Sequence, residues 1–176
     1  KKIVESTKPN PLNYYGNTKL LVEEHLIKNC SNYHILRTGW NVDINSKSRC
    51  VVTLTYKTLL GNKAKMAKDN SFTITHTNDL SVAIEKILFK LDKKILHLCS
   101  PDIVSRIRLA DIIIENSKNG NKMKYEPVLF SEIKYNEPRS RMNNLQSEIQ
   151  ELNNNLFFRP PLETIKEKVK YLDNIL

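Results

Sequence analysis

The chain has 176 residues, of which 40% are hydrophobic and 27% are charged, as in one globular domain or a domain with a fragment of another. No run approaches the roughly 18 apolar residues that a membrane-spanning helix needs, and no charged and apolar leader opens the chain. These features predict a soluble protein with no membrane partner.

The chain is basic, with a formal net charge of +9 from 28 Lys+Arg against 19 Asp+Glu. A basic protein attracts polyanions, but these lysines are scattered over every segment and form no block of five or six. No zinc-finger, homeodomain or ribonucleoprotein motif accompanies them. We therefore expect no nucleic-acid partner.

The three cysteines, Cys30, Cys50 and Cys99, lie far apart in the sequence and form no Cys-x-x-Cys pair. This spacing predicts neither a disulfide framework nor a zinc site. No His-x-x-x-His spacing supports another metal, so no metal site is expected. Thiols of this kind are typical of a reducing compartment, and the cytoplasm is the predicted location.

The first predicted helix covers residues 13–29. Pro9 and Pro11 hold its approach extended, and Asn13 can cap it. One face carries a stripe at helical spacing, and further apolar residues broaden that face. The stripe consists of Tyr15, Lys19, Val22 and Leu26. The helix is too apolar to stand alone, so we expect it to lie on a sheet.

A short apolar stretch at residues 33–38 predicts a strand that ends before Gly39 and Trp40. Ligands of open α/β sheets bind outside the carboxyl ends of the strands, which places Trp40 at the site. Residues 51–60 predict a helix, although their β-branched content leaves a strand open. Residues 65–75 predict one or two short strands.

The next elements alternate between helix and strand. Thr77 can cap a helix running to about residue 90, residues 95–98 predict a strand, and Ser105 opens another helix. This alternation is typical of an α/β fold. The last part predicts a strand at 125–129, an irregular stretch from Pro138, a short helix at 145–152 and a final amphipathic helix after Pro160.

Tyr15 and Lys19 are the first candidate catalytic residues. Positions four apart lie on one face of a helix, so the phenol and the ammonium can point into one pocket. A neighbouring cation favours the phenolate form, which helps a tyrosine to act as a proton donor to a carbonyl oxygen.

The residues around this pair resemble a known family. The segment from Glu5 to Glu24 contains Pro9-Asn10-Pro11-Leu12-Asn13 followed by Tyr15-Gly16 and Thr18-Lys19. It is similar to the active-site segment of extended short-chain dehydrogenase/reductases, especially dTDP-4-dehydrorhamnose reductases and related enzymes of nucleotide sugars. The stretch from His34 to Trp40 is similar to the family's next strand, which typically ends Leu-Arg-Thr-Ser-Trp.

Later landmarks follow in the family's order. Residues 75–80 resemble a Pro-Thr-x-x-x-Asp-Leu-Ala helix start, residues 95–98 with Ser105 resemble a strand followed by a helix, and residues 138–142 resemble a late Pro-Arg segment. Gly39 stands where the family usually has serine, and residues 41–43 also differ. The substrate-side wall therefore departs from the family, and the identity of the sugar stays open.

The family's glycine-rich turn for the cofactor pyrophosphate has no counterpart among the four glycines of this chain. Its catalytic serine or threonine would fall before Lys1. The resemblance thus implies the C-terminal part of a Rossmann-like doubly wound parallel sheet with a small α/β substrate-binding lobe. Residues 1–45 would end the NAD(P)-binding domain, and residues 46–176 would form mainly the lobe, with returning Rossmann elements.

The activity that the resemblance implies is NAD(P)H-dependent reduction of a 4-keto-6-deoxy nucleotide sugar. Tyr15 would protonate the carbonyl oxygen and Lys19 would hold the nicotinamide ribose, with NADP or NAD as cofactor. Arg37 and Thr38 are further cofactor-binding candidates, although Arg37 could instead pair with a carboxylate.

The substrate-binding candidates are Trp40, Asn41, Arg139 and Arg141. Trp40 could stack on the sugar or nucleotide or pack in the core, and the two arginines could clamp a diphosphate or form an exposed basic loop. A homodimer through the first helix is a further implication. The alternatives are a nucleotide-sugar epimerase or dehydratase of the same superfamily, and a non-catalytic subunit resembling the β subunit of methionine adenosyltransferase.

Overall fold

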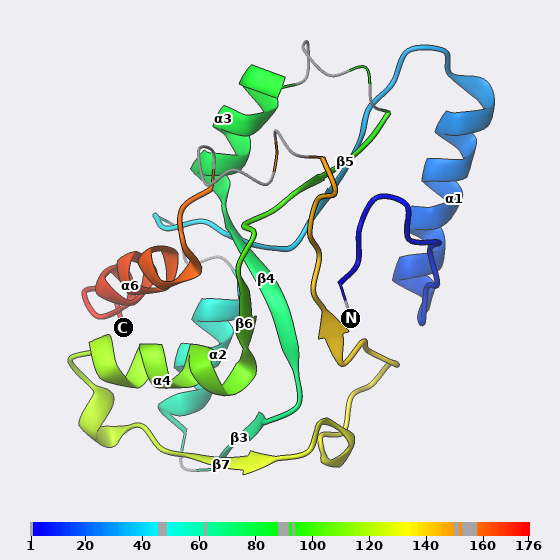
Figure 1. The fold of residues 1–176 in the computed structure, drawn as a ribbon. Coiled ribbons are helices and arrows are strands. Elements are labelled where there is room, and N and C mark those ends of the chain that lie inside the picture. Colours follow the sequence, from blue (N-terminus) through cyan, green and yellow to red (C-terminus); the bar gives the residue numbers. More distant parts are fainter. Residues whose placement is uncertain are drawn as a thin grey trace.

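The computed structural model describes residues 2–45, 49–61, 63–87, 92, 94–149, 152 and 158–176. The chain has an α/β fold with parallel sheets, as the sequence predicts (Figure 1). The helices are α1 (Tyr14–Asn29), α2 (Val51–Leu59), α3 (Thr77–Ile87), α4 (Arg106–Asn116) and α6 (Pro161–Leu172). The strands are β1 (Ile35–Thr38), β2 (Trp40–Val42), β3 (Ala64–Ala67), β4 (Ser71–His76), β5 (Ile95–Leu98), β6 (Ile103–Ser105), β7 (Tyr125–Val128) and β8 (Met142–Asn143).

The strands form small separate sheets. β1 pairs with β5 in parallel, in register from Ile35 opposite Ile95 to Thr38 opposite Leu98. β4 is the centre of the largest sheet, with β2 and β8 parallel to it and β6 antiparallel. β3 and β7 form a parallel pair at the far end of the molecule (Figure 1). The chain therefore passes directly from β1 to β2, that is, from one sheet to another, at Gly39.

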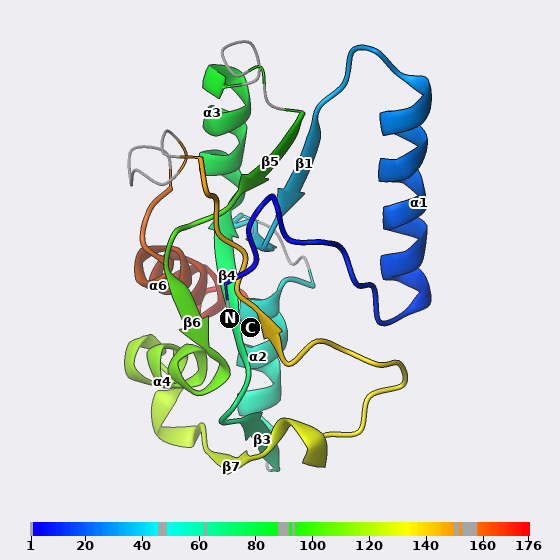
Figure 2. The ribbon, with the colours of Figure 1, turned by 45° about the vertical axis from the view of Figure 1, so that its right-hand side comes forward.

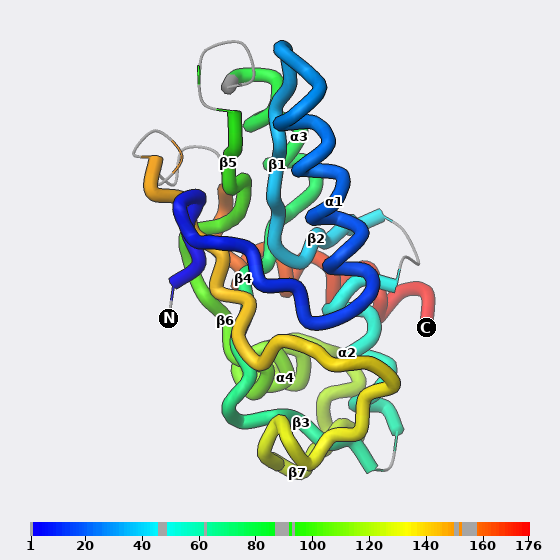
Figure 3. Tube along the Cα trace, turned by 90° about the vertical axis from the view of Figure 1, so that its right-hand side faces the viewer, coloured from blue at the N-terminus to red at the C-terminus, as the bar shows by residue number. Residues whose placement is uncertain are grey.

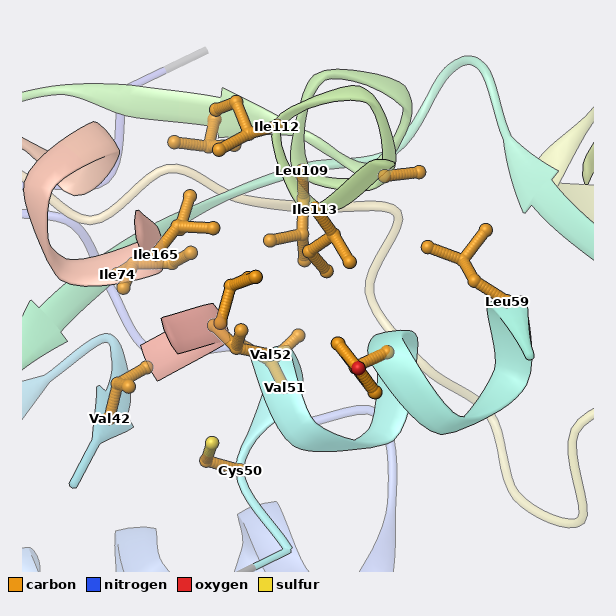
Figure 4. Close-up of a cluster of buried hydrophobic side chains, with 14 of the residues drawn as sticks. Val42, Cys50, Val51, Val52, Leu59, Ile74, Leu109, Ile112, Ile113 and Ile165 are labelled. Atoms are coloured by element: carbon orange, nitrogen blue, oxygen red, sulfur yellow. The ribbon is translucent and has the colours of Figure 1, made fainter. Parts of the chain in front are cut away.

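The main hydrophobic core lies between the β4 sheet and three helices. Figure 4 shows side chains of α2, α4 and α6 meeting Val42 of β2 and Ile74 of β4. Val52 and Ile113, from α2 and α4, are fully buried in this core. A second, smaller cluster packs Ala83 of α3 with residues of β5. The two clusters fix the β4 sheet and the β1–β5 pair as supports for the loops at their edges.

Two helix starts follow the capping residues that the sequence indicates. The Asn13 side chain accepts a hydrogen bond from the Gly16 amide at 2.8 Å, and the Ser105 side chain accepts one from the Arg108 amide at 3.0 Å. The predicted cap Thr77 is instead the first helical residue of α3, and His76 Nδ1 accepts from the Asn78 amide at 3.0 Å. Pro161 occupies the first turn of α6, where its missing N–H is no loss. The predictions of helices at 13–29, after Ser105 and after Pro160 are confirmed, as is the helical reading of 51–60.

The prediction of a helix at 145–152 is wrong for residues 145–149, which are not helical. Leu145 instead forms a parallel bridge with Ile3, whose amide donates to Asn144 O at 2.9 Å. Pairing with this distant segment overrides the local apolar pattern. The rest of that predicted helix, except for Leu152, and the end of the predicted third helix after residue 87 lie outside the described residues.

Helix α1 differs from expectation in its packing. It stands at the edge of the molecule (Figures 1 and 2) and has no buried residue. Leu21, Val22 and Ile27 are 63%, 57% and 51% exposed. The expected burial against a sheet is absent among the described residues, because no element covers the apolar side of α1. No described helix is long and apolar enough to cross a membrane.

Candidate active site

Two adjoining pockets lie beside the start of α1. The larger, of about 620 Å³, lies between residues 10–13 with Tyr15, the sheet residues Trp40 and Phe72, and the segment 130–140. The smaller, of 420 Å³, is lined by residues 38–41 together with Tyr15 and Leu145. Tyr15 and Trp40 line both pockets. The tube in Figure 3 shows the segment leading into α1 passing close to the chain around residue 140.

Tyr15 and Lys19 lie together on one face of α1. The Lys19 Nζ is 5.5 Å from the centre of the Tyr15 ring. Tyr15 is 67% exposed and lies in the first turn, immediately after the Asn13 cap, so its phenol is presented to both pockets. This arrangement places a proton donor beside the open space where a small ligand can bind. Lys19 lies over the Tyr15 ring but lines neither pocket.

Thr38 and Asn41 both line the smaller pocket. The Asn41 Nδ2 donates a hydrogen bond to Thr38 Oγ1 at 3.1 Å. Because Thr38 ends β1 and Asn41 lies in β2, this bond spans the turn between the two sheets. The smaller pocket thus offers hydroxyl and amide groups next to the Tyr15 phenol.

Trp40 packs in the core and lines the pockets at the same time. Its ring meets Phe72 edge-on, with ring centres 6.1 Å apart, and it is partly buried against the main core. The two alternatives for this tryptophan are therefore compatible: one part of the ring packs on β4 while another borders the open space.

Gly39 gives the smaller pocket a wall without a side chain. A Cβ at this position would lie 2.4 Å from Thr73 Oγ1 and 2.7 Å from Thr73 O. These distances are shorter than real carbon contacts, so any side chain would push the start of β2 away from β4. The absence of the usual serine thus follows from the close approach of the backbone at residue 39 to β4.

Arg37 binds a carboxylate and lines neither pocket. Its Nε donates to Glu23 Oε1 at 3.0 Å and its Nη2 to Glu23 Oε2 at 2.6 Å. Its Nη1 is 3.4 Å from Nε2 of the buried His97. Of its two predicted roles, the structure shows the carboxylate pair.

Arg139 and Arg141 lie in different surroundings. Arg139 lines the larger pocket, with its guanidinium 5.5 Å from the centre of the Tyr135 ring. Arg141 points elsewhere: its Nη1 is 3.4 Å from Asp69 Oδ2, and it lines neither pocket. The structure therefore does not bring the two arginines together as one clamp.

Arg106 is a pocket residue that sequence reasoning missed. Its guanidinium lies 4.7 Å from the centre of the Phe72 ring, and it donates to Asn70 Oδ1 at 3.3 Å and to Thr55 Oγ1 at 3.2 Å. None of the ion pairs among the described residues involves Arg106, and burial lowers its pKa. The sequence did contain a signal for this residue. The helix dipole disfavours a cation at the first residue of a helix, so an arginine at that position indicates some other interaction.

The electrostatics of the larger pocket favour an anion. Its charged lining residues are Arg106, Arg139 and Glu137, so positive groups outnumber negative ones. The part of the chain that the structure describes contains no group of His, Cys, Asp and Glu that could hold a metal. His76 ends β4 and His97 lies buried within β5, where burial lowers the pKa of each.

Comparison with known families decides the relationship. Residues 1–172 match the family described as the RmlD substrate binding domain. The chain belongs to this family. No curated protein matches it.

Solved structures share the fold. The dTDP-4-dehydrorhamnose reductase of Yersinia enterocolitica superposes with a TM-score of 0.77 at 23% identity, over 97% of this chain and 60% of that one. The corresponding reductase of Clostridium acetobutylicum gives 0.82 at 24% identity, over 98% and 60%. That of Bacillus anthracis, in complex with NADP, gives 0.76 at 22% identity, over 93% and 57%. The chain thus spans at most 60% of the length of these three reductases.

Proposed function

We propose that this chain works within a reductase that uses NADPH or NADH to reduce the keto group of a 4-keto-6-deoxy nucleotide sugar. The observation that carries the proposal is the Tyr15 phenol, with the Lys19 ammonium over its ring, at the junction of two pockets. Membership of the family and the fold shared with dTDP-4-dehydrorhamnose reductases support it.

The donor groups around the smaller pocket fit the nicotinamide end of the cofactor. Tyr15 and Thr38 offer hydroxyl groups in this pocket. Lys19, which lies over the Tyr15 ring outside the pocket lining, would hold the ribose together with Tyr15. When bound, the reduced cofactor supplies the hydride. The four glycines of the chain are too far apart for a pyrophosphate-binding turn, so we place that turn outside these 176 residues.

The proposed function also implies that the chain contributes to two domains. Residues 1–45, with α1 and β1, would complete a cofactor-binding domain, and residues 46–176 would form mainly the substrate lobe. β5 would return to the cofactor domain, since it pairs with β1 along its whole length.

Tyr15 is the proposed proton donor. As the carbonyl carbon is reduced, negative charge develops on its oxygen, and the phenolic proton moves from Tyr15 Oη to that oxygen. The Lys19 ammonium stabilises the resulting phenolate and eases its reprotonation from solvent, to which the exposed side chains are open.

The larger pocket is the proposed site of the nucleotide diphosphate. Arg139 lines the pocket, and a guanidinium suits phosphate oxygens because it can donate two parallel hydrogen bonds. Trp40 and Asn41 would contact the sugar at the junction with the smaller pocket. Arg141, bound to Asp69, would hold the segment that carries Arg139 in place and would not contact the substrate.

The exposed apolar side of α1 suits a further contact. We propose that Leu21, Val22 and Ile27 pack against the remainder of the protein or a second copy in a homodimer. The free cysteines are compatible with the reducing cytoplasm, where we place the protein.

The test is Tyr15→Phe in a full-length protein that contains these residues. We expect kcat for cofactor oxidation with a 4-keto-6-deoxy nucleotide sugar to fall by about 100-fold or more, since general acid catalysis contributes that much. Tyr14→Phe is the matched control, because Tyr14 is 79% exposed and lines neither pocket. Equal rates for Tyr15→Phe and the unsubstituted enzyme would exclude the mechanism. Product formed without net cofactor oxidation would indicate an epimerase or dehydratase.

A further inference from the structure

The Asn13 side chain makes hydrogen bonds in two directions. Its Oδ1 accepts from the Gly16 amide at 2.8 Å and so caps α1. Its Nδ2 donates to the Pro138 carbonyl at 3.0 Å. One side chain thus joins the start of the helix that carries Tyr15 to the residue that precedes Arg139.

This contact lies where two walls of the larger pocket meet. Asn13, Tyr15 and Arg139 all line that pocket, and the segments that carry them approach each other in Figures 2 and 3. Among the described residues, no other hydrogen bond joins residues 9–20 to residues 130–141. Since α1 has no buried residue, apolar packing does not replace this bond.

We propose that Asn13 is a positioning residue that links anion binding at Arg139 to the placement of Tyr15. The inference rests on the proposed function. The Nδ2 bond holds the 137–140 segment against the start of α1, so that the guanidinium and the phenol face the same substrate. Loss of this bond alone would let the segment move away and weaken binding of the nucleotide diphosphate.

The two bonds of Asn13 can be separated by substitution. Asn13→Asp keeps an oxygen that can accept from the Gly16 amide, and aspartate is as good a helix cap as asparagine. It has no donor for Pro138 O, and its charge repels that carbonyl. Asn13→Ser also caps but is too short to bridge. Asn13→Ala removes both bonds and reports the cost of losing the cap.

Asn17→Asp is the matched control. The Asn17 Nδ2 donates only to the Asn13 carbonyl, at 3.1 Å within the first turn of α1. The substitution makes the same charge change one helical turn later and leaves the bond to Pro138 O intact. Any effect of added negative charge near Tyr15 and Arg139 therefore appears in this variant as well.

The measurement is steady-state kinetics of the full-length protein. For Asn13→Asp and Asn13→Ser we expect KM for the keto-sugar nucleotide to rise by about five- to tenfold, the effect of one lost hydrogen bond. KM for the nicotinamide cofactor and the unfolding temperature should stay unchanged. Unchanged KM for the sugar nucleotide, or an equal rise in Asn17→Asp, would overturn the inference.

A binding measurement separates this inference from the proposed function. Trp40 is the only tryptophan of these 176 residues and lines the larger pocket, so the fluorescence change that Trp40→Phe abolishes reports titration with dTDP or UDP. Turnover with equal KM and equal nucleotide affinity in Asn13→Asp would refute the bridge and leave the reductase assignment standing. If the unsubstituted protein shows neither turnover nor nucleotide binding, both the role of Asn13 and the reductase assignment are refuted.

Discussion

Glu23 and Arg37 form a bidentate ion pair that holds the middle of α1 against β1. The two hydrogen bonds are 3.0 and 2.6 Å long, and the side chains are only 18% and 19% exposed. Because α1 buries none of its own residues, this ion pair holds the helix in place, whereas apolar packing holds α2 and α4. The orientation of Tyr15 about the helix axis thus depends on a charge pair two turns away.

Glu23→Gln should loosen α1. The amide keeps one acceptor but loses the charge, and we expect a destabilisation of about 1.5–2 kcal/mol, at the lower end of the range for hydrogen bonds to charged groups. Hydrogen exchange of the α1 amides should accelerate. Glu115→Gln is the control, because the Arg108–Glu115 pair is 53% and 54% exposed and should contribute little. Equal effects of both substitutions would refute the special role of the Glu23 pair.

Arg106→Ala should weaken nucleotide diphosphate binding. Arg106 lines the larger pocket and has no carboxylate partner among the described ion pairs, so its charge is available to a ligand anion. We expect Kd for dTDP or UDP to rise about tenfold or more by calorimetry, since a charge-assisted hydrogen bond contributes about 1.5–3 kcal/mol. Arg108→Ala, on the exposed side of α4, should leave Kd unchanged. A Kd that Arg106→Ala does not alter contradicts the assignment.

Glu5 predicts a pH-dependent stability. Its carboxylate accepts hydrogen bonds from the His97 amide at 2.9 Å, the Glu148 amide at 2.8 Å and the Ser147 hydroxyl. Burial raises the pKa of Glu5, but the hydrogen bonds together lower it by more than burial raises it. The pKa therefore lies below the ordinary 4.5. The carboxylate therefore stabilises the fold above about pH 4.5, and this contribution is lost as the pH falls through the lowered pKa.

Glu5→Gln should accordingly destabilise the chain by about 1–3 kcal/mol at neutral pH, because an amide cannot replace all these acceptors. The difference from the unsubstituted protein should shrink as the pH falls below 4.5 in urea unfolding. Glu148→Gln, at an exposed carboxylate that accepts from Ser6, is the control. A difference that is constant with pH would contradict the prediction.

Gly39→Ala should be destabilising despite the small size of the added methyl group. The new Cβ would fall 2.7 Å from the Thr73 carbonyl oxygen, which belongs to the backbone of β4 and cannot rotate away. We expect a loss of about 1–3 kcal/mol, the usual range for overpacking. Gly61→Ala, whose nearest contact would be 3.2 Å from Thr58 O, should cost less in thermal unfolding. Thr73→Ala in the same chain should restore only part of the loss, since the carbonyl stays.

Local sequence patterns predict those elements whose capping residue and buried side chains lie within the element itself. Ser105 caps α4 and Leu109 and Ile113 follow at helical spacing, so the helix is readable without its partners. β6 and β8 span only three and two residues and exist through their pairing with β4, which no local pattern reveals.

The candidate site shows the same division. The placement of Tyr15 and Lys19 on one face follows from their spacing, because both lie in one capped helix. The partner of Arg37 is 14 residues away in the sequence. Arg106, at the start of α4, lies over the ring of Phe72 in β4, and both residues line the larger pocket. Contacts of this kind depend on how the sheets pack, so the separation of Arg139 from Arg141 could not be predicted either.

The three cysteines leave a single point for attaching a probe. Cys50 is buried, and burial together with the nearby Glu5 raises the pKa of the buried Cys99 thiol to about 12. Cys30 is partly exposed and ends α1, at the opposite end of the helix from Tyr15. Of these three cysteines, a maleimide dye or spin label at neutral pH should therefore mark Cys30, which offers a probe for any movement of this helix when ligands bind.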